Sequence, residues 1–563
     1  MLAVLQEAQL KVKNMKKNLL KYTLIIASFI VSSCSPSSPS CDPDFEDCTS
    51  LVSVKMDDDK NKNYVMDPSS TNEKGSVNYE IFIRSFYDSD GDGIGDFNGV
   101  KEKLPYLKEL GVKDIWLMPF NKTNSYHGYD VVSYYDVNPD YGSIDDLIAL
   151  VNEAKKYNIG IVMDLVLNHS SKFNPWFNES YNDYYNGVSG EFSKADWYVW
   201  SFDALGGYHK YKDLYYEGDF DSSMPDFNLS SPSLRDEIKK IVKYWIDLGI
   251  KGFRLDAVLY YYYNSHESNI TFLKWLNDYI KSINEDVYLV GECWTDNQSV
   301  NEYYTSGAES FFDFGSSIKG NGYDSIIGVA KGTIGTKSFS SFIESKENVR
   351  KENNPKGYSS YFLSNHDMDR VSKNCYGEYA KAVASCYLLL PGTPYIYYGE
   401  EIEMVGERCT SPDDRSDVKR RLPMVWSKND ATGKCKFPEQ SRKDLDNTKQ
   451  VENGVNDMLK VNYSLINHYK KVINVRNKYP FIKHSYYKDL STSINSNERV
   501  LAYELSLNDE RIVVVQNFNS VNVEIDVSNV ANTILDSINT AKKVPTIKDG
   551  KLKIGAFSTV ILN

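Results

Sequence analysis

Short apolar segments alternate with amphipathic helical stretches from residue 77 onward, and this alternation limits the fold more than any other feature. Eight apolar segments have the length of buried strands: YEIFIRSF (79–86), DIWLMPF (114–120), IGIVMDLVLNH (159–169), GFRLDAV (252–258), VYLVGECW (287–294), SFFDFG (310–315), YFLSNHD (361–367) and TPYIYYGEE (393–401). Strand–helix alternation is typical of parallel strands. The pattern predicts an α/β fold, a (β/α)8 TIM barrel, whose functional residues lie at the carboxyl ends of the strands.

Two regions depart from this alternation. Residues 170–230 are rich in Tyr, Asp, Asn, Trp and Gly, which indicates an irregular domain inserted after the third strand. Near the C-terminus, segments such as RVLAYELSL and RIVVVQNF alternate apolar and polar residues, as antiparallel strands do. We therefore expect a barrel in two parts (76–169 and 231–480), an inserted domain (170–230) and a C-terminal antiparallel β domain, a β-sandwich (481–563).

The N-terminal residues have the layout of a targeting segment. A basic stretch precedes the apolar run TLIIASFIV (23–31), which is too short to span a bilayer. The sequence VSSC that follows resembles a bacterial lipobox, in which Cys34 becomes the lipidated first residue; an ordinary signal peptide is the alternative. We expect a lipoprotein signal peptide (1–33), a flexible tether (34–75), and an exported bacterial lipoprotein anchored at Cys34 in the cell envelope or on the cell surface.

The net charge of −13 disfavours nucleic acid or an anionic membrane surface as the main partner. The lipid anchor is therefore the only membrane contact that we expect. Export permits disulfide bonds, and the cysteine spacing offers three candidate pairs without assigning them: Cys41–Cys48, Cys375–Cys386 and Cys409–Cys435.

Three acidic residues stand at the ends of predicted strands: Asp256 in GFRLDAV, Glu292 in VGECW and Asp367 in SNHDMDR. Cleavage of a glycosidic bond needs a carboxylate that attacks the sugar or activates water, and a carboxylic acid that protonates the leaving oxygen. Arg254 lies two residues before Asp256, on the same strand face, and is expected to keep that carboxylate ionised. Apolar neighbours and Trp294 are expected to raise the pKa of Glu292 and keep it protonated.

The segments DLVLNH, GFRLDAV, GECW and FLSNHD resemble the four signature regions of the α-amylase family, glycoside hydrolase family 13, in order and spacing. The resemblance covers roughly residues 77 to 563. It implies a retaining double displacement in which Asp256 is the nucleophile, Glu292 the general acid/base and Asp367 a third acid that holds sugar hydroxyls. The substrate-binding residues that it implies are Tyr129, His127, His169, Arg254, His366 and Arg421.

Two features that can be compared with relatives bear on the mode of cleavage. The segment MPDFNL (224–229) resembles the MPDLN form of a fifth signature, found in a group intermediate between oligo-1,6-glucosidases and neopullulanases. Exo-acting relatives often place an aspartate three residues before the stacking Tyr129, paired with an arginine at the position of Arg421. Tyr126 replaces that aspartate here, which favours an open cleft and endo cleavage.

The positions just after the nucleophile differ from those of many α-amylases. Those enzymes carry Lys-His where this chain has Leu259 and Tyr260. The run of tyrosines from Tyr260 to Tyr263 would either stack on sugar or pack within the protein, so the contacts beyond the scissile bond are left open.

The segment DSDGDGIGDF (88–97) places four aspartates at alternate or near-alternate positions with glycines between them. Carboxylates this close repel one another, so either a cation neutralises them or the loop is a solvated acidic turn. The segment resembles the start of an EF-hand loop, without its glutamate at position 12, and a metal-binding loop of oligo-1,6-glucosidase-like relatives. We expect structural Ca²⁺, with Mg²⁺ less suited, bound by Asp88, Asp90, Asp92, the Ile94 carbonyl and Asp96. A second calcium site near Asn168 and Asp226 is left open.

Together these features predict an enzyme that cleaves α-1,4-glucosidic bonds of starch-like polysaccharides and maltooligosaccharides. One alternative is an oligosaccharide α-glucosidase or transglycosylase of the oligo-1,6-glucosidase type, which would release glucose alone from starch. Another is a non-catalytic relative that binds sugar or acts as a scaffold. Such a relative would be expected to lack a catalytic acid, whereas all three acids are present here.

Overall fold

The computed structural model describes residues 75–317, 326–408, 416–429, 431–437, 454–494, 499–540 and 544–563. The chain divides into two compact units, Met1–Lys55 and Met56–Asn563, and all described residues belong to the second. The predicted signal peptide, tether and lipidated Cys34 lie outside the described residues. Within the described part, no helix combines the length and apolar character needed to cross a bilayer.

Eight parallel strands form the central sheet in the order β12-β11-β10-β9-β5-β2-β1-β13. They are β1 (Asn78–Ile81), β2 (Asp114–Leu117), β5 (Gly160–Leu165), β9 (Gly252–Leu255), β10 (Tyr288–Gly291), β11 (Ser310–Phe312), β12 (Tyr358–Ser360) and β13 (Tyr395–Tyr397). Hydrogen bonds of 2.8 Å from Thr393 N to Ser359 O and from Tyr395 N to Tyr361 O join the two edge strands and close the sheet. The predicted (β/α)8 barrel is confirmed.

The seventh strand lies earlier than its predicted segment, 361–367. β12 consists of Tyr-Ser-Ser, and the apolar residues YFL follow it. The two serines are buried because they have polar partners: Ser359 Oγ donates to Glu347 Oε1 at 2.6 Å, and the Ser360 and Ser310 hydroxyls lie 2.5 Å apart. Apolar composition therefore marked the buried stretch after the strand and missed the strand itself.

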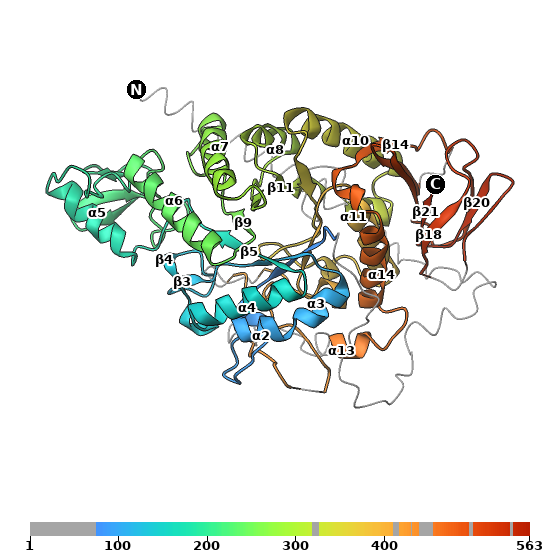
Figure 1. Ribbon diagram of the computed structural model, residues 1–563, viewed down its shortest axis with the longest axis horizontal. Coiled ribbons are helices and arrows are strands. Elements are labelled where there is room, and N and C mark those ends of the chain that lie inside the picture. The colour runs from blue at the N-terminus through green and yellow to red at the C-terminus, as the bar shows by residue number, and fades with distance from the viewer. Residues whose placement is uncertain are drawn as a thin grey trace, which may run out of the picture. The chain divides into compact units, whose positions relative to one another are not determined.

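The helices that connect the strands cover the outside of the barrel (Figure 1). They are α2 (Phe97–Glu102), α3 (Leu104–Leu110), α4 (Ile144–Lys156), α6 (Pro232–Asp247), α7 (His266–Ile283), α8 (Asn297–Tyr303), α9 (Ile326–Lys331), α10 (Thr336–Asn353), α11 (Glu378–Leu389), α13 (Val455–Met458) and α14 (Leu465–Lys478). Short 3-10 turns are Ile83–Ser85, Pro139–Tyr141, Tyr304–Ser306, Phe314–Ser316, Val371–Lys373, Glu400–Ile402 and Pro480–His484. Local capping explains several starts: Ser143 and Asp146 form a capping box on α4, and Ser231 caps α6 ahead of Pro232.

Two helical stretches are each divided in the structure. The stretch 100–111 spans the end of α2 and all of α3, because Pro105 in the first turn of α3 cannot continue a preceding helix. The stretch 455–478 is interrupted between α13 and α14, where Ser464 caps the new helix by accepting from Asn467 N.

The region after the third barrel strand is irregular, as expected. It contains α5 (Pro175–Tyr185) and a small sheet of β6 (Trp200–Ser201), β7 (Tyr208–Tyr211) and β8 (Leu214–Glu217), in the order β6-β8-β7. Aromatic rings form its core: the ring centroid of Phe177 lies within 5.2 Å of those of Tyr198, Trp200, Tyr211 and Tyr216. A separate hairpin, β3 (Asn121–Thr123) and β4 (Val131–Val137), follows the second barrel strand.

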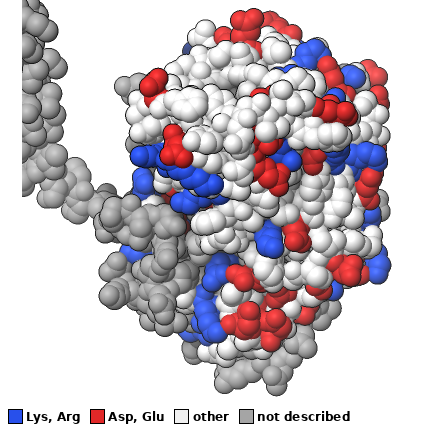
Figure 2. Space-filling view, turned by 90° about the vertical axis from the view of Figure 1, so that its left-hand side faces the viewer, with Lys and Arg blue, Asp and Glu red and all other residues white. Residues whose placement is uncertain are grey.

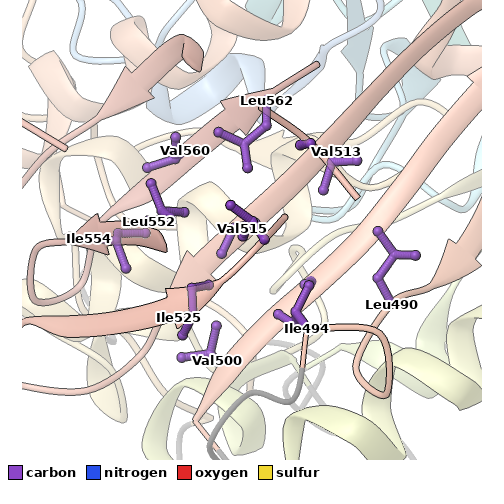
Figure 3. Packing of buried hydrophobic residues seen from close by; sticks show 13 residues of the cluster. Leu490, Ile494, Val500, Val513, Val515, Ile525, Leu552, Ile554, Val560 and Leu562 are labelled. Atoms are coloured by element: carbon purple, nitrogen blue, oxygen red, sulfur yellow. The ribbon is translucent and has the colours of Figure 1, made fainter. Parts of the chain in front are cut away.

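The C-terminal region contains two antiparallel sheets, so the predicted antiparallel β domain is confirmed. One has the order β14-β15-β16-β21-β18 and the other β17-β20-β19. The strands are β14 (Tyr486–Asp489), β15 (Val500–Leu507), β16 (Glu510–Asn517), β17 (Val523–Asp526), β18 (Ile534–Ile538), β19 (Thr546–Lys548), β20 (Lys551–Ile554) and β21 (Thr559–Leu562). Figure 3 shows the shared core, where Val515 and Val560 of the first sheet meet Ile525 and Leu552 of the second.

The candidate disulfide between Cys375 and Cys386 is not formed. Both residues are buried free thiols, and Cys386 lies within α11. Cys435 is also a buried free thiol; its candidate partner Cys409 and the pair Cys41–Cys48 lie outside the described residues.

Candidate active site

A cavity of about 780 Å³ opens at the carboxyl ends of the barrel strands. Residues that follow β5, β9, β10 and β12 line it, as the barrel rule predicts. Seven of the nine predicted catalytic and substrate-binding residues line it directly: His127, Tyr129, His169, Asp256, Glu292, Asp367 and Arg421. Arg254 and His366 do not line the cavity; they are buried and contact the lining residues Asp256 and Asp367.

Arg254 in β9 connects three carboxyl groups. Its Nη1 atom lies 2.6 Å from Asp256 Oδ1 and 2.8 Å from Asp164 Oδ1, and its Nη2 atom lies 2.9 Å from Glu292 Oε2. Alternation along the strand explains the first contact, because Arg254 and Asp256 are two residues apart. A single guanidinium therefore fixes the two predicted catalytic carboxyl groups relative to each other.

Ala257 provides a second contact to Glu292. Its φ of 49° lies in the left-handed region that non-glycine residues seldom adopt. In this conformation the Ala257 N–H donates to Glu292 Oε2 at 3.0 Å. The turn after the strand thus carries Asp256 and also holds the second acid in place.

Burial raises the pKa of the Asp256 and Glu292 carboxyls, and the Arg254 guanidinium acts in the opposite direction on both. Burial also raises the pKa of Asp164 to about 7, although the Arg254 guanidinium acts to lower it. The sequence predicts that Arg254 keeps Asp256 ionised; the guanidinium does lower the pKa of that carboxyl, but burial outweighs it, and Arg254 also pairs with Glu292. One guanidinium therefore faces three buried carboxyl groups and offsets the effect of burial on each of them only in part.

Asp367 follows β12 and is held by two cationic side chains. Its Oδ2 atom lies 2.8 Å from His366 Nε2, and its Oδ1 atom accepts from Arg421 Nη2 at 2.8 Å. Burial acts to lower the pKa of His366. The carboxylates of Asp367 and Glu80 outweigh burial and raise this pKa to about 10. His366 and Arg421 in turn keep the pKa of Asp367 well below its usual range despite burial, so the carboxyl is ionised at neutral pH.

Tyr129 forms the wall beside this pair. Its ring is stacked on that of His366, with centroids 5.7 Å apart, and its hydroxyl lies 2.7 Å from His366 Nε2. The ring of His127 also stacks with that of Tyr129, with centroids 6.1 Å apart. His169 is buried at the cavity edge, and burial lowers its pKa to about 4, so its imidazole is neutral at pH 7.

Tyr126 occupies the place where exo-acting relatives carry an aspartate. Its ring packs edge-on against Phe82 at 5.3 Å, and its hydroxyl is buried. Arg421 pairs with Asp367 and lies 3.8 Å from Asp417 Oδ2. Position 126 therefore supplies no carboxylate to pair with Arg421 across the cavity.

Comparison with known proteins identifies the family. The family model described as the α-amylase catalytic domain matches residues 80–485, a range that contains all of the side chains just described. The chain belongs to the α-amylase family. The model of the maltogenic amylase C-terminal domain matches residues 493–561.

Relatives within the α-amylase family carry more than one activity name. The chain is 37% identical over 500 residues to Alpha-amylase 3 of Dictyoglomus thermophilum, covering 87% of this chain and 93% of the relative. It is 30% identical over 524 residues to an oligo-1,6-glucosidase of Parageobacillus thermoglucosidasius, covering 79% of this chain and 90% of the relative. Among solved structures, Eubacterium rectale Amy13B superposes with a TM-score of 0.80 at 34% identity, covering 88% of this chain and 97% of that one. An α-amylase from H. orenii superposes with a TM-score of 0.75 at 31% identity, covering 87% of this chain and 99% of that one.

Sequence reasoning missed two residues of this α-amylase-family site. Asp164, the first residue of DLVLNH, binds Arg254 and also accepts from Trp116 Nε1 at 3.2 Å. Glu80 in β1 lies 2.6 Å from His366 Nδ1. The signal for both was an acidic residue inside an otherwise apolar strand, which is seldom buried unless it is paired.

The aspartate-rich loop lies between β1 and α2. One carboxylate oxygen from each of Asp88, Asp90 and Asp96 lies within 4.8 Å of the others, a donor set that suits a hard divalent cation. Gly91 and Gly93 have φ values of 89° and 97°, which let their N–H groups donate to the Asp88 carboxylate at 2.7 Å. The Asp92 carboxylate accepts from Ile94 N at 2.6 Å and is not part of this cluster.

Two further observations bear on metal binding. The Lys436 amine donates to the Asp92 carbonyl and thereby places a positive charge beside the loop. At the second calcium position that was left open, Asn168 and Asp226 contact each other directly, with Asn168 Nδ2 donating to Asp226 Oδ1 at 3.0 Å.

Proposed function

We propose that this α-amylase-family protein is a retaining, endo-acting enzyme that cleaves α-1,4-glucosidic bonds of starch-like polysaccharides and maltooligosaccharides. The observation that carries the proposal is the pairing of Asp256 and Glu292 with the same Arg254 guanidinium at the cavity edge. Retaining glycosidases hold their two carboxyl groups about 5–5.5 Å apart, whereas inverting enzymes leave room for a water at about 6.5–9.5 Å. Two carboxylates on one guanidinium favour the closer arrangement.

In the proposed reaction Asp256 attacks the anomeric carbon while Glu292 gives a proton to the leaving oxygen. Burial raises the pKa of Glu292, which favours the protonated form that this step requires. In the second step Glu292 takes a proton from water while the water oxygen bonds to the anomeric carbon and the bond from that carbon to Asp256 breaks. Asp367, ionised and fixed by His366 and Arg421, would hold the sugar hydroxyls as the ring distorts.

Endo cleavage is proposed because position 126 carries a tyrosine. A carboxylate there would pair with Arg421 and close one end of the cavity, and Tyr126 cannot form that pair. Product profiling on amylose, pullulan, cyclodextrin and isomaltose tests this. The proposal expects mixed maltooligosaccharides from amylose at early times and little turnover of isomaltose. Glucose as the sole product, or rapid cleavage of isomaltose, would establish the oligo-1,6-glucosidase type of activity instead.

We also propose that the aspartate loop binds structural Ca²⁺. The close approach of the Asp88, Asp90 and Asp96 carboxylates supports the proposal. Asp92 and Ile94 remain predicted ligands. When bound, the ion would supply positive charge that offsets the repulsion among these carboxylates. The loop precedes α2, whereas the catalytic acids follow β9 and β10, so the effect should be on stability and not on products.

Replacing Asp90 by asparagine should remove most of the calcium dependence of the melting temperature. A site filled at about 100 times its dissociation constant adds about 2.7 kcal/mol of stability. Asp90 is exposed and its carboxylate accepts the Asp92 N–H, so the variant should match the wild type in chelator. Calorimetry with and without calcium measures this, with D145N, at an exposed acid on α4, as the control. A wild-type protein that contains no Ca²⁺ or Mg²⁺ and does not respond to calcium has only a solvated acidic turn here.

We propose that Cys34 carries a lipid anchor, on the basis of the VSSC sequence after a basic and apolar leader. Cys34→Ser should prevent fatty-acid incorporation and leave the protein either released or unprocessed. One acyl chain binds membranes only weakly, so stable anchoring requires more than one. Metabolic labelling with a fatty acid, followed by membrane fractionation, measures both effects. Continued labelling and membrane partition of the variant would show that the anchor lies elsewhere.

A further inference from the structure

Two consecutive glutamates are buried just after the last barrel strand. Glu400 and Glu401 lie in the 3-10 turn Glu400–Ile402, which follows β13, the strand that pairs with β1. Glu400 is 2% exposed and Glu401 is 0% exposed. Acidic side chains ordinarily lie at the surface, as on the face in Figure 2, and are seldom buried without a cation. Neither glutamate lines the active-site cavity, so the proposed reaction does not account for them.

Tyrosine hydroxyls bind both carboxyl groups. Each glutamate accepts two of them through its Oε1 atom: those of Tyr387 and Tyr469 for Glu400, and those of Tyr79 and Tyr106 for Glu401. Both bonds to Glu400 are 2.7 Å long, and the bond from Tyr79 is 2.6 Å long. The four tyrosines belong to α11, α14, β1 and α3, in that order. The two acids therefore connect the turn after β13 to one neighbouring strand and three helices.

Within the described part of the chain, the side-chain partners of both carboxyls are hydroxyls and not cations. The charge of Arg370 acts on both acids, but its Nε and Nη1 atoms donate to the carbonyls of Arg420 and Tyr398 at 2.9 and 2.6 Å. Its Nη2 atom and the Oε2 atoms of both glutamates are buried without a hydrogen-bond partner. The other titratable groups around the pair are the four tyrosines and the Cys375 thiol. Burial raises the pKa of each of these, so all are neutral at pH 7.

An ionised carboxylate is costly at this position, because burial removes its water and no cation replaces that water. Burial raises the pKa of Glu400 to about 8, although the tyrosine hydroxyls act to lower it. Burial raises the pKa of Glu401 against the same opposing effect. A glutamate in the unfolded chain has a pKa of about 4.3. The folded protein therefore keeps protons at neutral pH that the unfolded chain has lost.

We propose that Glu400 and Glu401 form a proton-dependent clamp on the closing seam of the barrel, which consists of β1, β13, α3, α11 and α14. In the protonated form the two acids hold these elements together through the tyrosine hydroxyls. Ionisation favours any opening that exposes the charge to water, so alkaline pH loosens the seam. The clamp lies outside the active-site cavity and does not depend on the proposed function.

The direction of the pH effect follows from linkage. A carboxyl whose pKa is raised by folding stabilises the protein most below its unfolded pKa, and this contribution is lost as pH rises through the folded pKa. For Glu400 the loss therefore begins above about pH 4.3 and is complete above about pH 8.

Glu400→Gln tests the clamp, because the amide keeps the shape of the protonated acid and cannot ionise. Urea unfolding at pH 5.5, 6.5 and 7.5 gives the ratio of the wild-type unfolding constant to that of the variant. Other titrating groups cancel in this ratio. It should rise about tenfold per pH unit, since the wild type keeps one more proton on folding. Glu401→Gln should give a ratio that rises in the same direction, and it replaces Glu400→Gln if that variant does not fold.

Glu347→Gln is the matched control. Glu347 is equally buried but accepts from Arg350 Nη2 at 2.8 Å. Although burial acts to raise its pKa, the charges of Arg350 and Lys346 lower it to about 2. Glu347 is therefore ionised in both the folded and the unfolded protein above pH 5.5, and its ratio should not change with pH. Ratios for Glu400→Gln and Glu401→Gln that are equally constant would overturn the clamp.

Peptide-resolved hydrogen exchange locates the opening. Wild type and Glu400→Gln are compared at the same pH, so that the chemical exchange rate cancels. At pH 6 the two should agree, and at pH 8.5 peptides of the closing seam should exchange faster in the wild type. Equal exchange of these peptides at pH 8.5, or faster exchange only in other parts of the chain, would show that the acids do not hold the seam.

Discussion

Replacing Asp256 by asparagine should reduce hydrolysis of maltooligosaccharides by about 10³-fold or more, because it removes the nucleophile of the proposed double displacement. Glu292→Gln should cause a loss of the same order by removing the proton donor to the leaving oxygen. Both substitutions preserve side-chain size and allow hydrogen bonds to Arg254 to remain, so the fold should be intact. Initial rates on maltotetraose and circular dichroism measure the two parts of this prediction.

Azide distinguishes the two variants. It can replace water as a nucleophile that needs no general base, so it should restore turnover of an activated substrate by Glu292→Gln and give a glycosyl azide of retained α configuration. Asp256→Asn cannot form the same glycosyl–enzyme and should not be rescued in this way. Wild-type-like turnover by either purified variant would contradict the assigned roles.

Replacing Arg254 by methionine should destabilise the protein by about 3–5 kcal/mol, because three buried carboxyl groups lose their shared partner. Without the guanidinium, burial raises the pKa of Asp164, Asp256 and Glu292 further above unfolded values near 4. A carboxyl whose pKa is higher in the folded state holds its proton longer there, so folding loses free energy as pH rises above the unfolded pKa. The destabilisation should therefore be smaller at pH 5 than at pH 7.5.

Arg476 offers a matched control for this pH dependence. It is equally buried, but its guanidinium donates to the Ser76 hydroxyl and to carbonyls of Leu388, Leu390 and Gly392 instead of carboxylates. Arg476→Met should destabilise the protein by a similar amount at both pH values. Urea unfolding of both variants at pH 5 and 7.5 measures the difference. A loss in Arg254→Met that is the same at both pH values would contradict the carboxyl cluster.

The pH profile of Arg254→Met should also change. Activity needs an ionised Asp256 and a protonated Glu292, and both carboxyls should titrate at higher pH once the guanidinium is gone. Both limbs of the bell-shaped profile should move upward, along with a lower kcat. Arg254→Lys keeps a positive charge but lacks the fork that reaches both acids, so its shift should be smaller.

The barrel could be predicted from the sequence because each of its strands lies at or beside an apolar segment bounded by a helix. The seventh strand could not, since its Tyr-Ser-Ser sequence is buried only through hydroxyl partners such as Glu347, which lies on α10. The interruption before α14 was also hidden, because the residues around it remain compatible with a helix and only the Ser464 cap marks the new start. Such contacts join segments distant in sequence or depend on local backbone geometry.

The predicted catalytic acids could be placed because each follows its own strand, and parallel strands bring their carboxyl ends together. Their electrostatics could not be predicted from neighbours in the sequence. Arg254 adjoins Asp256 along the chain, yet the closed barrel also brings it to Glu292 and Asp164. Likewise, the pairing of Glu80 with His366 spans 286 residues and has no local sign beyond an acid within an apolar strand.

Covalent trapping of the intermediate tests the central claim most directly. A fluorinated maltosyl fluoride, whose glycosyl–enzyme forms faster than it hydrolyses, should add one maltosyl unit to the wild-type protein. Peptide mapping by mass spectrometry should place that unit on Asp256, and Asp256→Asn should remain unlabelled. A label on another carboxylate, or no covalent adduct together with release of the inverted anomer from maltotetraose, would contradict the account.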